Sequence, residues 1–156
     1  MKKITIRKCT LKDADCILKI FNESISKGLT ETKTKIQLDE HIKWLKKKLF
    51  SKKDIIYICK INKTTGGYIR FDNIYRNRCE ISIAFKKQYI NKGFGSILLK
   101  RSIKKLIKLK KIKTIKSKVK KKNMNSIKFF LKNNFVEIKV KKRDKENYKY
   151  FILNLK

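Results

Sequence analysis

One stretch decides the fold of this chain: Lys87-Gln88-Tyr89-Ile90-Asn91-Lys92-Gly93-Phe94-Gly95-Ser96. It follows an apolar run over 81–85 that predicts a strand, and it leads into apolar residues at three- and four-residue spacing over 97–107, which predict a helix. The glycines leave backbone N–H groups uncovered at the positive end of that helix. Such a turn suits a phosphate group, although two glycines one residue apart also occur in a simple tight strand-to-helix connection.

This segment resembles the acetyl-coenzyme A signature of the GNAT family of N-acetyltransferases. In that family a Gln/Arg-x-x-Gly-x-Gly/Ala turn between the fourth strand and the third helix binds the pyrophosphate. Gly93 and Gly95 match the two small positions, whereas Ile90 stands at the Gln/Arg position. Phosphate binding here would therefore depend on backbone N–H groups, with Lys92 or Lys87 as charge partners.

The resemblance implies that acetyl-coenzyme A is the cofactor, with no metal, and it implies which residues contact the coenzyme. Pantetheine would run along the fourth strand, whose backbone groups would also polarise the thioester. The implied contacts are Ile83, Ala84 and Phe85 in the strand, Tyr89, Asn91, Lys92, Gly93, Phe94, Gly95 and Ser96 in the turn, and Asn123, Ser126 and Phe130 further along.

The segment over 123–135 resembles the family's Asn-x-x-Ser motif and the Gly-Phe that follows it. Phe130 stands where many members have a tyrosine that protonates the departing thiolate, so this chain lacks that acid. Water or another group would supply the proton, or the low pKa of a thiol relative to an amine would make the acid dispensable. Asn123 is in addition a good N-cap for the helix that follows it.

The composition favours one globular domain over 1–156, because hydrophobic residues make up 41% of the chain and the aromatic residues are spread along it. No apolar run approaches the roughly 20 residues that a membrane span needs. The first six residues enter a strand pattern at once, with no signal-peptide core. We therefore expect a cytoplasmic protein without a membrane partner.

The four cysteines are scattered, and only one histidine could join them in a metal site, so reduced thiols are expected. The net charge of +33 would suit a polyanionic partner. The excess is nearly all lysine, however, which an A+T-rich coding sequence would also produce. We therefore expect no specific nucleic-acid partner, while a basic nucleic-acid-binding protein on the same fold remains the non-enzyme alternative.

The periodicity predicts the order β-α-α-β-β-β-α-β-α-β-β. Strands are predicted over 3–8, 55–61, 68–72, 79–85, 112–119, 135–140 and 148–155, with turns over 62–67 and between the last two strands. The first predicted helix is capped by Thr10 and Asp13 and ends at about residue 24. Further helices are predicted over 38–49, 95–109 and 123–133. This order is that of the GNAT fold, which implies an α/β (α+β) protein with a mixed, mostly antiparallel sheet of about seven strands flanked by four helices.

Glu80 is the first candidate for the base that accepts the amine proton. Strand alternation places Glu80 and Ser82 on the face opposite Cys79, which also argues against an acetyl-cysteine route. The alternative for Glu80 is an ordinary surface ion pair. His41, on or beside the apolar face of its helix, is the second candidate base or an acceptor contact, or else a structural residue.

Within the family the closest likeness is to the sugar-amine acetyltransferases of nonulosonic (pseudaminic-type) acid synthesis. Matching segments lie at 40–45, 67–72 and 80–83, whereas in the first helix only Asn22 agrees. The likeness implies a nucleotide-linked amino sugar as the amine acceptor, with Asn22, Trp44 and Arg70 as substrate contacts. The alternative enzyme acetylates a protein or peptide amine. A homodimer is left open.

Overall fold

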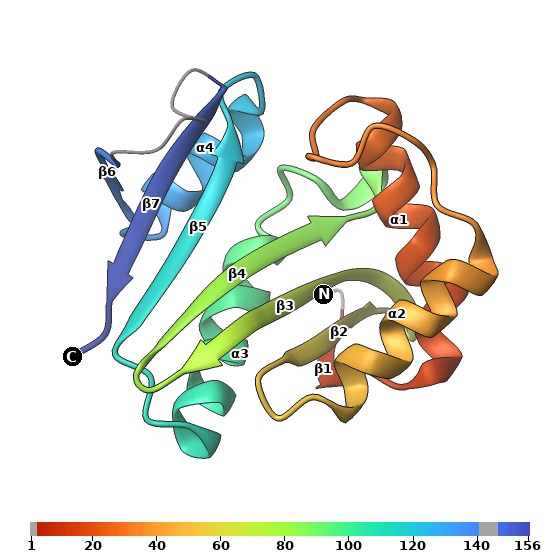
Figure 1. Ribbon diagram of the computed structural model, residues 1–156, viewed down its shortest axis with the longest axis horizontal. Coiled ribbons are helices and arrows are strands. Elements are labelled where there is room, and N and C mark those ends of the chain that lie inside the picture. The colour runs from red at the N-terminus through yellow and green to blue at the C-terminus, as the bar shows by residue number, and fades with distance from the viewer. Residues whose placement is uncertain (1–2, 141–146) are drawn as a thin grey trace.

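A seven-stranded sheet forms the centre of the computed structural model, which describes residues 3–140 and 147–156 (Figure 1). The strands lie in the order β1-β2-β3-β4-β5-β7-β6. All neighbouring strands are antiparallel except β4 and β5, which are parallel. The strands are β1 Ile4–Lys8, β2 Ile55–Ile61, β3 Thr64–Tyr75, β4 Arg78–Phe85, β5 Thr114–Lys120, β6 Val136–Ile138 and β7 Tyr148–Asn154. The helices are α1 Ala14–Ser26, α2 Leu38–Phe50, α3 Phe94–Leu109 and α4 Met124–Lys132, with short 3₁₀ turns at Leu11–Asp13 and Lys87–Tyr89.

This architecture confirms the order of elements and the mixed sheet that the sequence predicts. The predicted turn over 62–67 is wrong in length, because β3 already begins at Thr64. Only Asn62 and Lys63 form the turn, with backbone φ angles of 49° and 69° that close a hairpin tightly. The sixth strand is also shorter than predicted, and the predicted turn between the last two strands lies largely outside the described residues.

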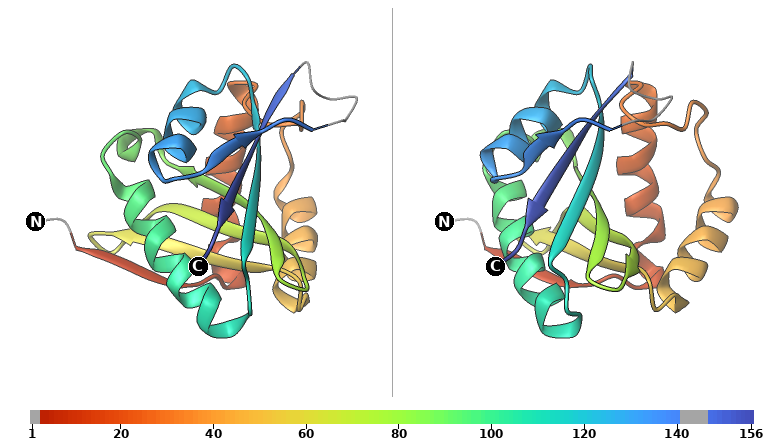
Figure 2. Two further views of the ribbon diagram at one scale, coloured as in Figure 1. Left: turned by 90° about the vertical axis from the view of Figure 1, so that its left-hand side faces the viewer. Right: turned by 60° about the vertical axis from the view of Figure 1, so that its left-hand side comes forward.

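Helices cover both faces of the sheet (Figure 2), with α1 and α2 on one side and α3 and α4 on the other. Strand alternation assigns the side chains to these two faces. On β3, Tyr68 packs in the core beneath α1 and α2, whereas Ile69 and Phe71 belong to the core beneath α3 and α4. The face toward α1 and α2 therefore receives Arg70 and Asp72 as well, and it is the polar face of the sheet's centre.

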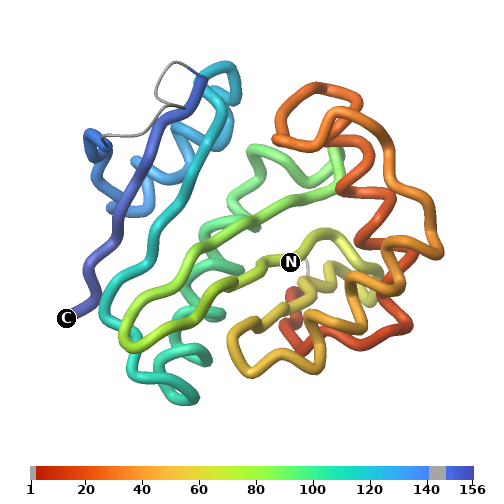
Figure 3. Tube along the Cα trace, in the orientation of Figure 1, coloured from red at the N-terminus to blue at the C-terminus, as the bar shows by residue number. Residues whose placement is uncertain are grey.

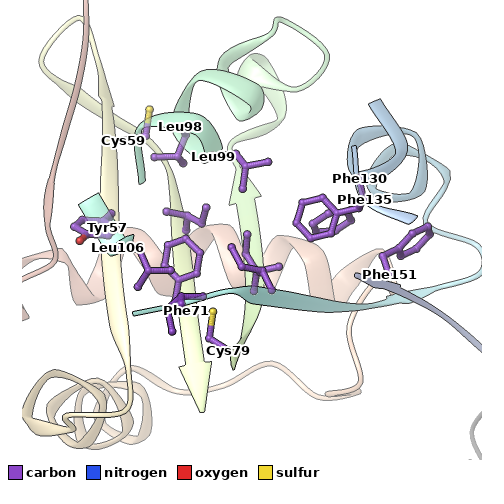
Figure 4. Close-up of a cluster of buried hydrophobic side chains, with 14 of the residues drawn as sticks. Tyr57, Cys59, Phe71, Cys79, Leu98, Leu99, Leu106, Phe130, Phe135 and Phe151 are labelled. Carbon is purple, nitrogen blue, oxygen red and sulfur yellow. The ribbon is translucent and has the colours of Figure 1, made fainter. Parts of the chain in front are cut away.

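The larger core lies between the sheet and helices α3 and α4 (Figure 4). Leu98 and Leu106 of α3 and Phe71 of β3 are fully buried in this core. Each such side chain contributes about 1.5–3 kcal/mol relative to an exposed one. This packing fixes α3, and with it the turn that precedes α3, against the end of β4.

The start of the first helical segment is held by Asp13, as the Thr10 and Asp13 pattern predicts. The Asp13 carboxylate accepts hydrogen bonds from the Thr10 backbone N–H at 2.9 Å and from both terminal nitrogens of Arg7 at 2.6 and 2.8 Å. Burial opposes ionisation of this carboxyl, but these bonds hold its pKa below the ordinary value. The cap and the ion pair together fix α1 to the edge strand β1.

The parallel strands β4 and β5 pair only at their beginning. Their register joins Arg78, Cys79 and Glu80 to Thr114, Ile115 and Lys116. Beyond these residues the two strands separate, as the Cα trace shows (Figure 3). The sheet is thus open along one line between β4 and β5.

Within residues 3–140 and 147–156, no helix combines the length and apolar character that a membrane crossing requires.

Candidate active site

A cavity of about 450 Å³ fills the opening between the separating strands. One wall is β4 from Glu80 to Ala84, and the facing wall is β5 from Ser117 to Lys120. The polar face of β3, the connection between α1 and α2, and the start of α4 complete it. A cavity at a parallel pair whose strands diverge is the first candidate for a binding site in this molecule.

Glu80 projects into this cavity from β4 and is exposed there. It lies directly opposite Asp72 in the β3–β4 register. Asp72 has cationic partners of its own, because Lys48 Nζ lies 2.9 Å and Arg70 Nε 2.5 Å from its carboxylate oxygens. Among the described residues, the Glu80 side chain has no hydrogen bond and no ion pair. The surface ion pair considered as the alternative for Glu80 is therefore not present among these residues.

Trp44 and Arg70, two predicted acceptor contacts, both line the cavity. The Arg70 guanidinium lies over the Trp44 ring at 5.2 Å from its centroid, and Asp72 holds its Nε. In the described part of the chain, the two terminal nitrogens of Arg70 donate no hydrogen bond. A planar, pre-oriented group with unused donors is suited to the oxygens of a ligand.

His41 does not line the cavity. It is buried, with 3% of its surface exposed, and its ring stacks on Trp44 at 5.2 Å. Burial and the neighbouring Arg70 guanidinium lower its pKa, so the ring is neutral at neutral pH. This placement supports the structural interpretation of His41, as a support for Trp44, over the role of base.

Asn22, the third predicted acceptor contact, lies outside the cavity lining. Its side-chain amide pairs with the backbone of Ile36, donating to the carbonyl oxygen and accepting from the N–H, both at 3.0 Å. The amide thus fastens the end of the connection between α1 and α2 to helix α1. Its contribution to the site is to position that connection.

The coenzyme contacts predicted on β4 lie along the open strand edge. Ile83 and Ala84 line the cavity, and Phe85 packs on the larger core. The β4–β5 ladder ends at Glu80, so the side of β4 that faces β5 has no strand partner from Ile81 onward. Unpaired backbone groups on such an edge can pair with an extended ligand, as an added strand would. This edge fits the amide groups of pantetheine.

The turn before α3 has the backbone that a phosphate site requires. Gly93 is the N-cap of α3 and has a φ angle of 80°, which other residues adopt with strain. No side chain caps the first N–H groups of this 16-residue helix. Tyr89 stacks edge-on against the buried Phe94 at 5.7 Å and thereby supports the turn, while Asn91 and Lys92 are exposed.

Gly95 lies where α3 and α4 approach each other. A Cβ atom added at this position would meet Phe129 Cε2 at 2.9 Å, which is closer than side chains normally pack. Ser96, next along the helix, is half-buried. Glycine at this position keeps the helix start uncovered and close to α4, so the geometry fits the pyrophosphate that the sequence motif predicts.

Helix α4 contributes Asn123, Ser126 and Phe130 to the cavity wall. The Asn123 side chain accepts a hydrogen bond from the Ser126 N–H at 3.1 Å, which confirms its role as N-cap. Phe130 is buried against Phe135 and Phe151, with ring centroids 4.9 and 6.0 Å away. Phe130 offers no hydroxyl to a thiolate. Burial raises the pKa of Tyr68, also at the cavity, to about 12, so it is a poor acid as well.

Sequence reasoning missed the opposite wall of the cavity. Lys118 and Lys120 of β5, Tyr148 of β7 and Glu31 of the α1–α2 connection all line it. The alternation of lysines along β5 was a signal for a charged strand face. Nothing in the sequence indicated which elements lie across from that face.

Cys79 is an unsuitable nucleophile. It is only 3% exposed and packs in the larger core, on the strand face opposite Glu80. Burial raises its pKa to about 12, and the negative charges of Asp72 and Glu80 act in the same direction. Double-reciprocal plots at several fixed concentrations of the second substrate should therefore intersect, as for a ternary complex. Parallel lines together with a trapped acetyl-cysteine would contradict this prediction.

In the described part of the chain, no group of three or more His, Cys, Asp and Glu side chains is placed to hold a metal ion. The four cysteines are free thiols.

Comparison with known proteins gives consistent matches. A family model described as an acetyltransferase (GNAT) domain matches residues 3–136. The acetyltransferase PseH of Campylobacter jejuni is 32% identical over 104 residues, 66% of this chain and 65% of PseH, so the match spans less than two thirds of that relative. An N-acetyltransferase from Staphylococcus aureus Mu50 has a TM-score of 0.81, 26% identity and 99% coverage of both chains. A Salmonella typhimurium protein, solved with its cofactor acetyl-CoA, has a TM-score of 0.81 at 18% identity, covering 98% of this chain and 94% of its own.

Proposed function

Because the chain belongs to the GNAT family of acetyltransferases, we propose that it transfers the acetyl group of acetyl-coenzyme A to the amine of a nucleotide-linked amino sugar. The observation that carries this proposal is the cavity between β4 and β5, where an unpaired carboxylate lies among cationic and aromatic side chains. The similarity to PseH and the likeness to sugar-amine acetyltransferases support the acceptor class. We place the protein in the cytoplasm, as one catalytic domain with reduced thiols.

The coenzyme supplies the acetyl group as a thioester. The residues proposed to hold it are the β4 edge at Ile83 to Phe85 and the first N–H groups of α3. Asn123 and Ser126 line the cavity. A backbone N–H on the β4 edge would also stabilise the oxyanion, a role that preorganised donors serve in acyl transfer.

Glu80 is the proposed general base. The Glu80 carboxylate takes one proton from the ammonium form of the acceptor, and the neutral nitrogen bonds to the carbonyl carbon. The carbon–sulfur bond then breaks to release a thiolate, and the nitrogen loses its second proton to water. Water is the proposed proton source for that thiolate, because Phe130 has no acidic group. Because a thiolate is a far better leaving group than an amine anion, the reaction proceeds without a protein acid at this step.

Trp44 and Arg70 are the proposed acceptor contacts. The Trp44 ring offers an apolar face on which a sugar or a base can stack, and Arg70 offers two terminal nitrogens to sugar oxygens. Asp72 holds Arg70 in this orientation, and Lys48 in turn pairs with Asp72. The recognition is thus built on strands and a helix, which position side chains more firmly than a loop does.

A thermal-shift screen tests the proposal against its two alternatives. Acetyl-coenzyme A and UDP-linked sugars should each raise the melting temperature, since a ligand that binds only the folded state stabilises it. Stabilisation by an oligonucleotide that persists at high salt would instead favour a nucleic-acid-binding protein. A shift with acetyl-coenzyme A and with an amine-bearing peptide, but with no UDP-sugar, would favour the protein or peptide acetyltransferase.

A further inference from the structure

The cavity wall formed by β5 carries two lysines that the proposed chemistry does not use. Lys118 and Lys120 alternate along β5 on the same face as Lys116, which is in register with Glu80. They lie about 7 and 13 Å further along the strand than Lys116, given the rise of a β-strand. These cations therefore stand beyond the base, toward the open end of the cavity.

Residues 27–37, which we call the α1–α2 segment, connect α1 to α2 (Figure 3). Both lysines contact this segment. Lys118 Nζ forms an ion pair with the Glu31 carboxylate, and its charge lies 4.1 Å from the centre of the Tyr148 ring. Lys120 Nζ donates to the Gly28 carbonyl oxygen at 3.3 Å. The lysine side chains thus connect β5 to the α1–α2 segment, whose far end Asn22 fastens at Ile36.

The β3 wall and the β5 wall of the cavity differ in how their cationic side chains are paired. On the β3 side, Lys48 and Arg70 are balanced by Asp54 and Asp72. On the β5 side, the Glu31 carboxylate pairs with Lys118. The Glu31 side chain is itself 63% exposed. Exposed ion pairs contribute little to stability, so this contact can be exchanged for a stronger anion at low cost.

We propose that Lys118, with Lys120 beside it, binds the diphosphate of the acceptor, and that Glu31 occupies Lys118 in the free protein until the diphosphate displaces it. A diphosphate carries enough negative charge for both lysines and forms charge-assisted hydrogen bonds with each. One sugar ring then spans the interval between the diphosphate and an amine at Glu80. This inference rests on the proposed acceptor class. It names the residues that bind the negatively charged diphosphate of that acceptor.

Steady-state kinetics of four variants test this inference, with a UDP-linked amino sugar and the matching free amino sugar as acceptors. Lys118→Gln should raise KM for the UDP-linked acceptor at least tenfold, with kcat and KM for acetyl-coenzyme A within about twofold of the parent. Glu31→Gln should lower that KM several-fold, because the competing carboxylate is gone. KM for the free amino sugar should change in neither variant.

The double variant and a matched control complete the test. In Lys118→Gln/Glu31→Gln the gain from Glu31→Gln should vanish, because the lysine for which Glu31 competes is absent. Glu137→Gln removes another exposed carboxylate, which pairs with Lys149 at 2.9 Å. Glu137 lies outside the cavity lining, so this variant should leave all constants unchanged. Equal effects of Lys118→Gln on both acceptors, or a raised KM in Glu31→Gln, would overturn the inference.

Binding of UDP, measured by calorimetry without turnover, separates this inference from the proposed function. The parent protein should bind UDP, Lys118→Gln at least tenfold more weakly, and Glu31→Gln more tightly. If those changes occur while no amino sugar is acetylated, the anion site stands and the acceptor class is wrong. If amino sugars are acetylated while UDP affinity is the same in all three proteins, the inference is wrong and the function stands.

Discussion

Glu80→Gln is expected to lower kcat about 10²- to 10⁴-fold, the usual contribution of a positioned general base. The substitution preserves the shape of the side chain and removes only its basicity. Because Asp72 already has Lys48 and Arg70 as partners, it is not positioned as a substitute base. KM for acetyl-coenzyme A should stay nearly unchanged, since the proposed coenzyme contacts lie further along β4. Initial rates at saturating substrates measure the effect.

The pH profile gives this prediction a second, independent readout. Raising the pH should partly restore the rate of Glu80→Gln, because the acceptor amine then loses its proton in solution. The matched control is Glu137→Gln, which removes a carboxylate of the same type outside the cavity lining. If His41→Asn lost activity by orders of magnitude while Glu80→Gln stayed within a few-fold of the parent, His41 would be the base.

Gly95→Val should abolish the stabilisation that acetyl-coenzyme A gives to the folded protein. The Cβ atom of the new side chain meets Phe129 Cε2 at 2.9 Å, at the second residue of α3, where the coenzyme pyrophosphate is proposed to bind. With ligand at a hundredfold excess over its dissociation constant, the parent should gain about 2.7 kcal/mol. For a chain of this size that corresponds to a rise of roughly 5–10 °C in melting temperature.

Each variant serves as its own reference in that experiment. Gly95→Val is expected to melt lower than the parent without ligand, since Phe129 must move, so only the shift upon ligand addition is compared. Ile97→Val is the matched control on the same helix, because the Ile97 N–H already donates to the Gly93 carbonyl. It should retain the full shift. A full shift in Gly95→Val would show that the coenzyme binds elsewhere.

The sequence predicted most of the fold because its signals are local. Alternation along β4 placed Cys79 and Glu80 on opposite faces, and the glycine turn placed the start of α3 at the end of that strand. The pattern over 62–67 misled because both glycines suggested a long turn. Instead, Asn62 and Lys63 adopt positive φ angles, and Gly66 and Gly67 lie within β3.

The sequence predicted a site residue only where the pattern of a single helix or strand indicated it. Glu80, Trp44 and Arg70 were identified from strand and helix periodicity together with the family likeness, and all three line the cavity. The Glu31 and Lys118 pair joins residues 87 positions apart, and no local pattern encodes that contact. The sequence also did not indicate that the Asn22 amide hydrogen-bonds to the Ile36 backbone, 14 residues further along the chain.

The most direct test of the account is a product measurement with purified protein, acetyl-coenzyme A and a UDP-linked amino sugar. Mass spectrometry should detect the N-acetylated nucleotide sugar, formed in equal amount to the coenzyme A thiol released, and neither product should accumulate with Glu80→Gln on the same timescale. Acetylation of a peptide amine under the same conditions, with the nucleotide sugar left unmodified, would contradict the account.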